Sequence, residues 1–90
     1  MASNTVDEVR KALEEMKSGF VGSTCNIERV LVTEGLKVLD DYAEVKVEYE
    51  KALKDRDDDG YREYILAGMR AGETQINLIA AILRSAGRIK

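Results

Sequence analysis

The chain of 90 residues contains no histidine, no proline and no tryptophan, and it has one cysteine and one phenylalanine. Without histidine there is no imidazole base, no Cys-His nucleophilic pair and no histidine ligand for a catalytic zinc ion. The single cysteine, Cys25, excludes an intramolecular disulfide and favours a reducing compartment. We therefore expect a protein that is not an enzyme and that carries no cofactor.

Long hydrophobic runs are absent as well. No stretch approaches the roughly 20 apolar residues that a membrane span needs, and residues 1–17 lack the apolar core of a secretory signal. We expect a cytoplasmic protein, with leaderless export as an open alternative. A chain this short is expected to form a single helical domain over residues 1–90, with a small core that gains burial from partners.

The charges nearly balance, with 14 basic and 17 acidic side chains and a formal net charge of -3. A nucleic-acid binder normally carries a clear excess of basic residues, so nucleic acid is not an expected partner. The distribution is uneven, because residues 31–60 are rich in acids whereas residues 61–90 hold more bases than acids. An acidic and a basic surface would meet if these two segments folded back on each other.

Helical periodicity is the strongest signal in the sequence. In three segments the apolar residues recur at alternating spacings of about three and four, which is typical of amphipathic helices. The pattern predicts an all-α fold, a long antiparallel helical hairpin plus a short N-terminal helix, packed together as a three-helix bundle. The expected helices cover about residues 5–18, 24–54 and 60–86.

The third segment has two unusual features. Gly68 and Gly72 lie in its predicted interior, where each glycine costs about 1 kcal/mol relative to alanine, so their presence indicates close packing or a ligand. The stretch TQINLIAAIL, residues 74–83, contains no charged side chain and is apolar on nearly all sides. A helix that is hydrophobic all round is expected to be buried all round.

The lengths of the three expected helices predict self-association. The first helix is long enough to cover only about half of the hairpin, so the other half needs a partner. A homodimer or higher oligomer would complete a bundle by burying one shared set of residues: Gly68, Gly72, Ile76, Leu78, Ile79, Ile82 and Leu83. Two alternatives stay open: the first helix folds over these residues in a monomer, or a small molecule binds between the glycine-lined helices.

The sequence DRDDDGYREYIL, residues 55–66, carries aspartates at alternate positions followed by a glycine. Over its first six residues it resembles the start of an EF-hand calcium loop. The resemblance implies oxygen ligands from Asp55, Asp57, Asp59 and Glu63. Leu66 stands where the bidentate glutamate of that loop should be, so we favour an acidic turn that caps the next helix. A weak calcium-responsive module is the alternative.

In size and build the chain is similar to small secreted helical hairpins, such as type III secretion needle subunits and the WXG100 proteins. It lacks the Trp-x-Gly turn of the second group and the proline-containing turn of the first. Such a likeness of architecture carries no function with it. The sequence therefore predicts a helical protein-protein interaction module that acts as a homo-oligomer, in the role of adaptor, inhibitor or assembly subunit.

Overall fold

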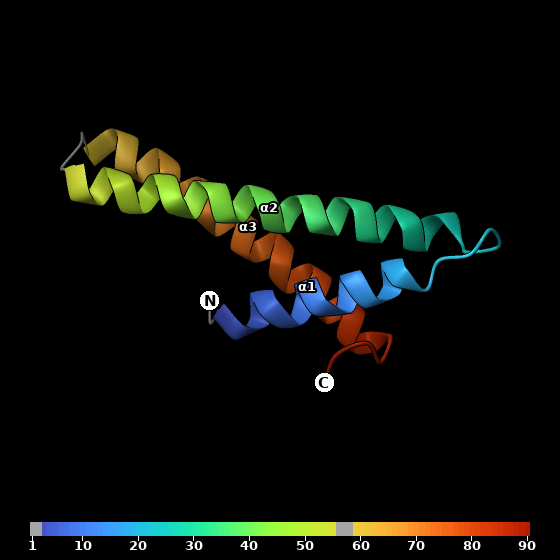
Figure 1. Ribbon diagram of the computed structural model, residues 1–90. Coiled ribbons are helices and arrows are strands. Elements are labelled where there is room, and N and C mark those ends of the chain that lie inside the picture. The colour runs from blue at the N-terminus through green and yellow to red at the C-terminus, as the bar shows by residue number, and fades with distance from the viewer. Residues whose placement is uncertain (1–2, 56–58) are drawn as a thin grey trace.

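The computed structural model describes residues 3–55 and 59–90. They form three helices, α1 (Ser3–Ser18), α2 (Asn26–Asp55) and α3 (Asp59–Ser85), and none of these residues lies in a strand (Figure 1). The helices α2 and α3 run antiparallel as a long hairpin, and α1 lies across the half of that hairpin that is far from its turn. The prediction of an all-α hairpin with a short N-terminal helix is confirmed.

The connection between α1 and α2 is held by hydrogen bonds within it. The amide of Val21 donates to the hydroxyl of Thr24 at 2.8 Å, and the amide of Thr24 donates to the carbonyl of Val21 at 2.9 Å. Arg29 also donates to the Val21 carbonyl, and its guanidinium lies 5.0 Å from the centre of the Phe20 ring. Because Thr24 belongs to this turn, α2 begins at Asn26 rather than near residue 24.

The end of α3 is closed by a Schellman motif. Gly87 has a φ of 75°, a conformation that favours glycine, and its amide donates to the carbonyl of Arg84 at 3.0 Å. The next amide, that of Arg88, reaches back to the carbonyl of Leu83 at 2.8 Å. This turn directs the C-terminal tail back toward α1, so that Ile89 packs against the core.

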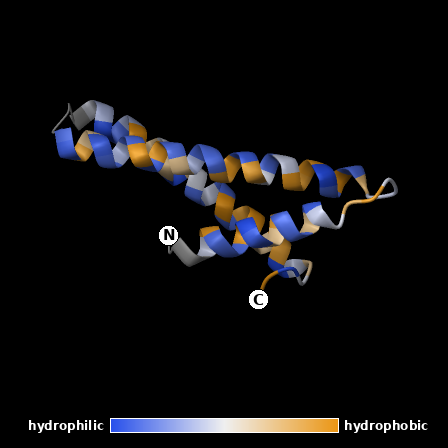
Figure 2. Cartoon of the chain, in the orientation of Figure 1, coloured by the Kyte–Doolittle hydropathy of each residue, from blue (hydrophilic) through white to orange (hydrophobic). Residues whose placement is uncertain are grey.

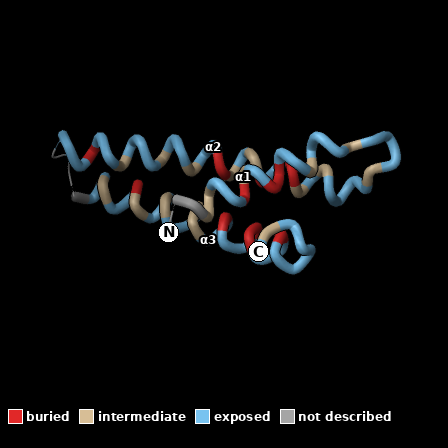
Figure 3. The backbone as a smooth tube through the Cα atoms, turned by 60° about the horizontal axis from the view of Figure 1, so that its bottom comes forward, coloured by how far each residue is buried: buried red, intermediate tan, exposed pale blue. Residues whose placement is uncertain are grey.

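The core lies where α1 crosses the hairpin. Figure 3 shows most buried positions gathered there, and Figure 2 shows hydrophobic residues concentrated where the C-terminal half of α3 passes α1. All three helices contribute buried apolar residues to this cluster: Val9, Ala12, Leu13, Val32, Leu39, Ile76, Ile79, Ala80 and Leu83. Removing each large side chain from water contributes about 1.5 to 3 kcal/mol, which is what holds α1 on the hairpin.

The other half of the hairpin is a two-helix arm. Beyond Ala43 on α2 and before Gly72 on α3, the buried hydrophobic residues are Ala52 and Ile65. The chain is accordingly elongated, 50 × 24 × 15 Å, with a Cα radius of gyration of 15.2 Å, against about 12 Å for a compact chain of this length. No helix in the described ranges combines the length and hydrophobicity needed to span a membrane.

Candidate functional site

Three of the expected interface residues lie in the core of the single chain. Ile76, Ile79 and Leu83 are 0%, 9% and 1% exposed, and they pack with the buried residues of α1 and α2. Their burial therefore comes from α1 and α2 of the same chain, as in the monomer alternative of the sequence analysis. They add nothing to the surface that a partner can reach.

Gly72 lies in the contact between α2 and α3. A Cβ at this position would lie 3.0 Å from Cδ2 of Tyr42, so the absent side chain lets the tyrosine ring lie against α3. The Tyr42 hydroxyl then donates to Oε1 of Glu73 at 3.1 Å. Burial, followed by this hydrogen bond and the negative charge of Glu73, raises the pKa of Tyr42 above its ordinary value. Gly72 thus serves packing within the chain.

The other three expected interface residues are accessible. Leu78 is 63% and Ile82 is 44% exposed, and exposed Gly68 has only Val45 nearby, at 3.8 Å from the position of an added Cβ. They belong to a row of exposed residues at alternating spacings of four and three along α3. We call this row the α3 stripe; its six members are Tyr64, Gly68, Ala71, Gln75, Leu78 and Ile82.

The α3 stripe is distinct from the other helix surfaces because it carries no charge. Between Tyr64 and Leu83 the charged residues of α3 are Arg70 and Glu73, and neither is in the stripe. The exposed positions of α1 and α2, in contrast, are dominated by acids and bases. An uncharged row of this length, with exposed Leu and Ile side chains, on an otherwise charged surface is typical of a helix that packs against a partner.

Sequence reasoning missed three members of the stripe as surface residues. The interface predicted from the sequence contains none of Tyr64, Ala71 and Gln75. The signal was present, since the heptad-like spacing and the lack of charge are both visible in the sequence. It was hidden because a parallel row, with Ile65, Ile76 and other residues, has a similar period and faces α2.

The residues of the acidic stretch that the structure describes are helical. Asp55 ends α2, Asp57 lies outside the described residues, and α3 begins at Asp59. The backbone is already helical at Asp59 and Gly60, the fifth and sixth loop positions, where a calcium loop should make its sharp turn. Glu63 is exposed. Among the side chains that the structure describes, no group of three His, Cys, Asp or Glu residues could hold a metal ion.

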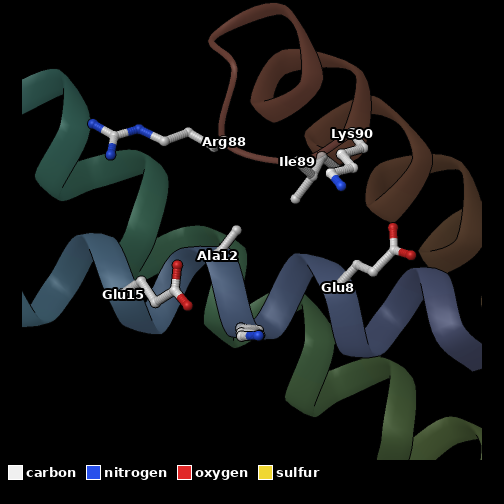
Figure 4. A pocket seen from close by; sticks show the side chains of 7 residues that line it. Glu8, Ala12, Glu15, Arg88, Ile89 and Lys90 are labelled. Atoms are coloured by element: carbon white, nitrogen blue, oxygen red, sulfur yellow. The ribbon is translucent and has the colours of Figure 1, made fainter.

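A hollow of about 270 Å³ lies between α1 and the C-terminal tail (Figure 4). Ile89 points toward Ala12 on its floor, while carboxylates and cations of both segments line the rest: Glu8, Lys11, Glu15, Arg88 and Lys90. The lining combines no nucleophile with a base and gathers no charge of one sign. The hollow is best described as the space left where the C-terminal tail packs on α1.

The function of the α3 stripe has to be inferred from its own chemistry, because comparison of the chain with protein-family models, curated protein sequences and solved structures found no match.

Proposed function

We propose that this protein is a non-enzymatic helical association module that works as a homodimer or higher oligomer, and that the α3 stripe is its contact surface. The single observation that carries the proposal is the uncharged stripe on α3, with Tyr64 77%, Leu78 63% and Ile82 44% exposed. Apolar surface left in water is unfavourable by about 25 cal/mol per Å², so covering this stripe with another helix stabilises the assembly.

The small residues of the stripe support the same proposal. Gly68 and Ala71 have little or no side chain, so a second helix can approach α3 closely and gain contacts along the backbone. An adaptor, an inhibitor or an assembly subunit would use such a surface. We propose the cytoplasm as the working compartment, because Cys25 is an exposed free thiol and a reducing compartment keeps such thiols from forming intermolecular disulfides.

Neither alternative function has comparable support. A small ligand between glycine-lined helices would need the space beside Gly72, and the Tyr42 ring fills it. A calcium-responsive loop would need its sharp turn at Asp59 and Gly60, where α3 has already begun. Association is therefore the function that an exposed surface of the protein, the α3 stripe, supports.

The test is the solution mass, measured by light scattering after size exclusion, for the wild type and for Leu78→Asp. We expect the wild type to be a dimer or larger, unchanged between calcium and chelator. Leu78→Asp should be a monomer with the helical circular dichroism of the wild type, because a charge buried in the contact is strongly unfavourable while the same charge on an exposed position is tolerated.

Val47→Asp is the matched control. Val47 is 65% exposed on α2, close to the exposure of Leu78, but it lies among charged residues. This variant should keep the mass of the wild type. A monomeric wild type at every concentration contradicts the proposal, and so does an equal loss of mass in both variants, which would mean that any added charge disrupts the assembly.

A further inference from the structure

We infer that two copies of the chain pair through their α3 stripes in antiparallel orientation, centred on residue 73, with Tyr64 of one copy opposite Ile82 of the other. The inference rests on the proposed function and specifies its partner and geometry. Its first ground is the spacing of the stripe, which is the same in both directions from residue 73: Tyr64, Gly68 and Ala71 on one side mirror Ile82, Leu78 and Gln75 on the other. An antiparallel pair in this register therefore leaves no stripe residue without an opposite member.

The sizes of the side chains favour this orientation. In the antiparallel register Gly68 lies opposite Leu78 of the second copy, and the two-fold axis repeats the contact at the other end. The large side chain of Leu78 thus packs on the bare helix surface at Gly68 of the other copy. The same contact occurs on both sides of the two-fold axis. A parallel pair would place Gly68 opposite Gly68 and Leu78 opposite Leu78, which leaves a gap at one layer and crowds another.

The stripe is large enough for a stable contact. From Tyr64 to Ser85 α3 rises about 33 Å, and its uncharged exposed side takes up roughly 18 Å of an accessible circumference of about 46 Å. Two such surfaces would bury about 1,200 Å² together, above the roughly 1,000 Å² that a specific interface needs. A second copy of α3 therefore suffices to cover the stripe.

The orientation is tested by cross-linking single cysteines with a short bis-maleimide. Cys25 is exposed and is first replaced by serine, and Tyr64→Cys and Ile82→Cys are then made separately in that background. In the inferred dimer, identical introduced cysteines lie about 27 Å apart along the helix axes, whereas a thiol at position 64 of one copy faces a thiol at position 82 of the other. Each variant alone should stay uncross-linked, and a mixture of the two, after subunit exchange, should give covalent dimers.

Every outcome separates the orientation from the proposed function. Covalent dimers in each variant alone indicate a parallel pair and overturn the inference, and so does the absence of cross-links in a mixture that light scattering reports as dimeric. A wild type that is monomeric by mass overturns the proposed function itself. Adding Leu78→Asp to both variants is the specificity control, and it should abolish cross-linking in the mixture.

Discussion

At the scale of single residues, the contact between Tyr42 and Glu73 links the packing of α2 on α3 to pH. The hydroxyl of Tyr42 donates to a carboxylate oxygen at 3.1 Å, and its pKa is raised by burial and by Glu73. A raised pKa means that the fold favours the neutral phenol. The stability from this contact is therefore complete below the unfolded-state pKa of about 10 and is lost as the pH rises through the raised pKa.

Tyr42→Phe tests this linkage. Near pH 8 the variant should be less stable than the wild type by about 1 kcal/mol, because one hydrogen bond is lost and Glu73 loses a partner. Above about pH 10 the difference should shrink, since the wild type loses the same contact by ionisation. Urea unfolding of both proteins across this range gives the difference directly, and the ionisation of other side chains cancels from it. A constant gap at every pH would contradict the linkage.

At the scale of helices, two glycines differ in what their missing side chain permits. At Gly35 of α2 a Cβ would lie 2.8 Å from Cδ1 of Leu13, which is fully buried, so α1 can pack this closely only on a glycine. At Gly68 of α3 the nearest atom is Cγ1 of Val45, at an ordinary 3.8 Å. The first glycine sets the distance between two helices of one chain, whereas the second leaves room on the outer surface.

Gly35→Ala and Gly68→Ala should consequently differ in their effect on stability. Gly68→Ala should stabilise the chain by about 1 kcal/mol, the gain in helix propensity. Gly35→Ala gains the same propensity but crowds Leu13, at a cost of about 1 to 3 kcal/mol, so it should be neutral or destabilising. Both are measured by chemical unfolding in the Leu78→Asp background, which compares them as monomers. A stabilised Gly35→Ala would mean that Leu13 moves aside freely.

Helix existence could be predicted from the sequence because periodicity is a local property, and the hairpin of α2 and α3 followed from it. The side of α3 that other helices cover could not be predicted from the sequence. Ile76 and Leu78 lie in the same uncharged run, yet Ile76 is 0% exposed and Leu78 is 63% exposed. The difference arises because α1 crosses α3 on one side, and the sequence does not say on which side α1 crosses. The expectation that this run is buried all round does not hold within one chain. The start of α2 was missed for a similar reason, because Thr24 is held by a turn with Val21.

At the scale of the whole molecule, the shape of the chain makes the mode of association measurable. The single chain is a slab of 50 × 24 × 15 Å with a radius of gyration of 15.2 Å. Two copies that pair along α3 lie side by side, because paired helices approach to about 8 to 10 Å between their axes. Two copies that meet through the turn of the hairpin would instead double the long dimension.

Small-angle X-ray scattering distinguishes these assemblies. Pairing along α3 separates the two centres of mass by about 20 to 25 Å, so the radius of gyration should rise only to about 18 to 20 Å. Contact through the ends of the arms would give about 29 Å, because the centres are then separated by the length of the chain. Leu78→Asp should return the value to that of the single chain. A dimeric mass combined with the larger radius would move the contact from the α3 stripe to the ends of the two-helix arms.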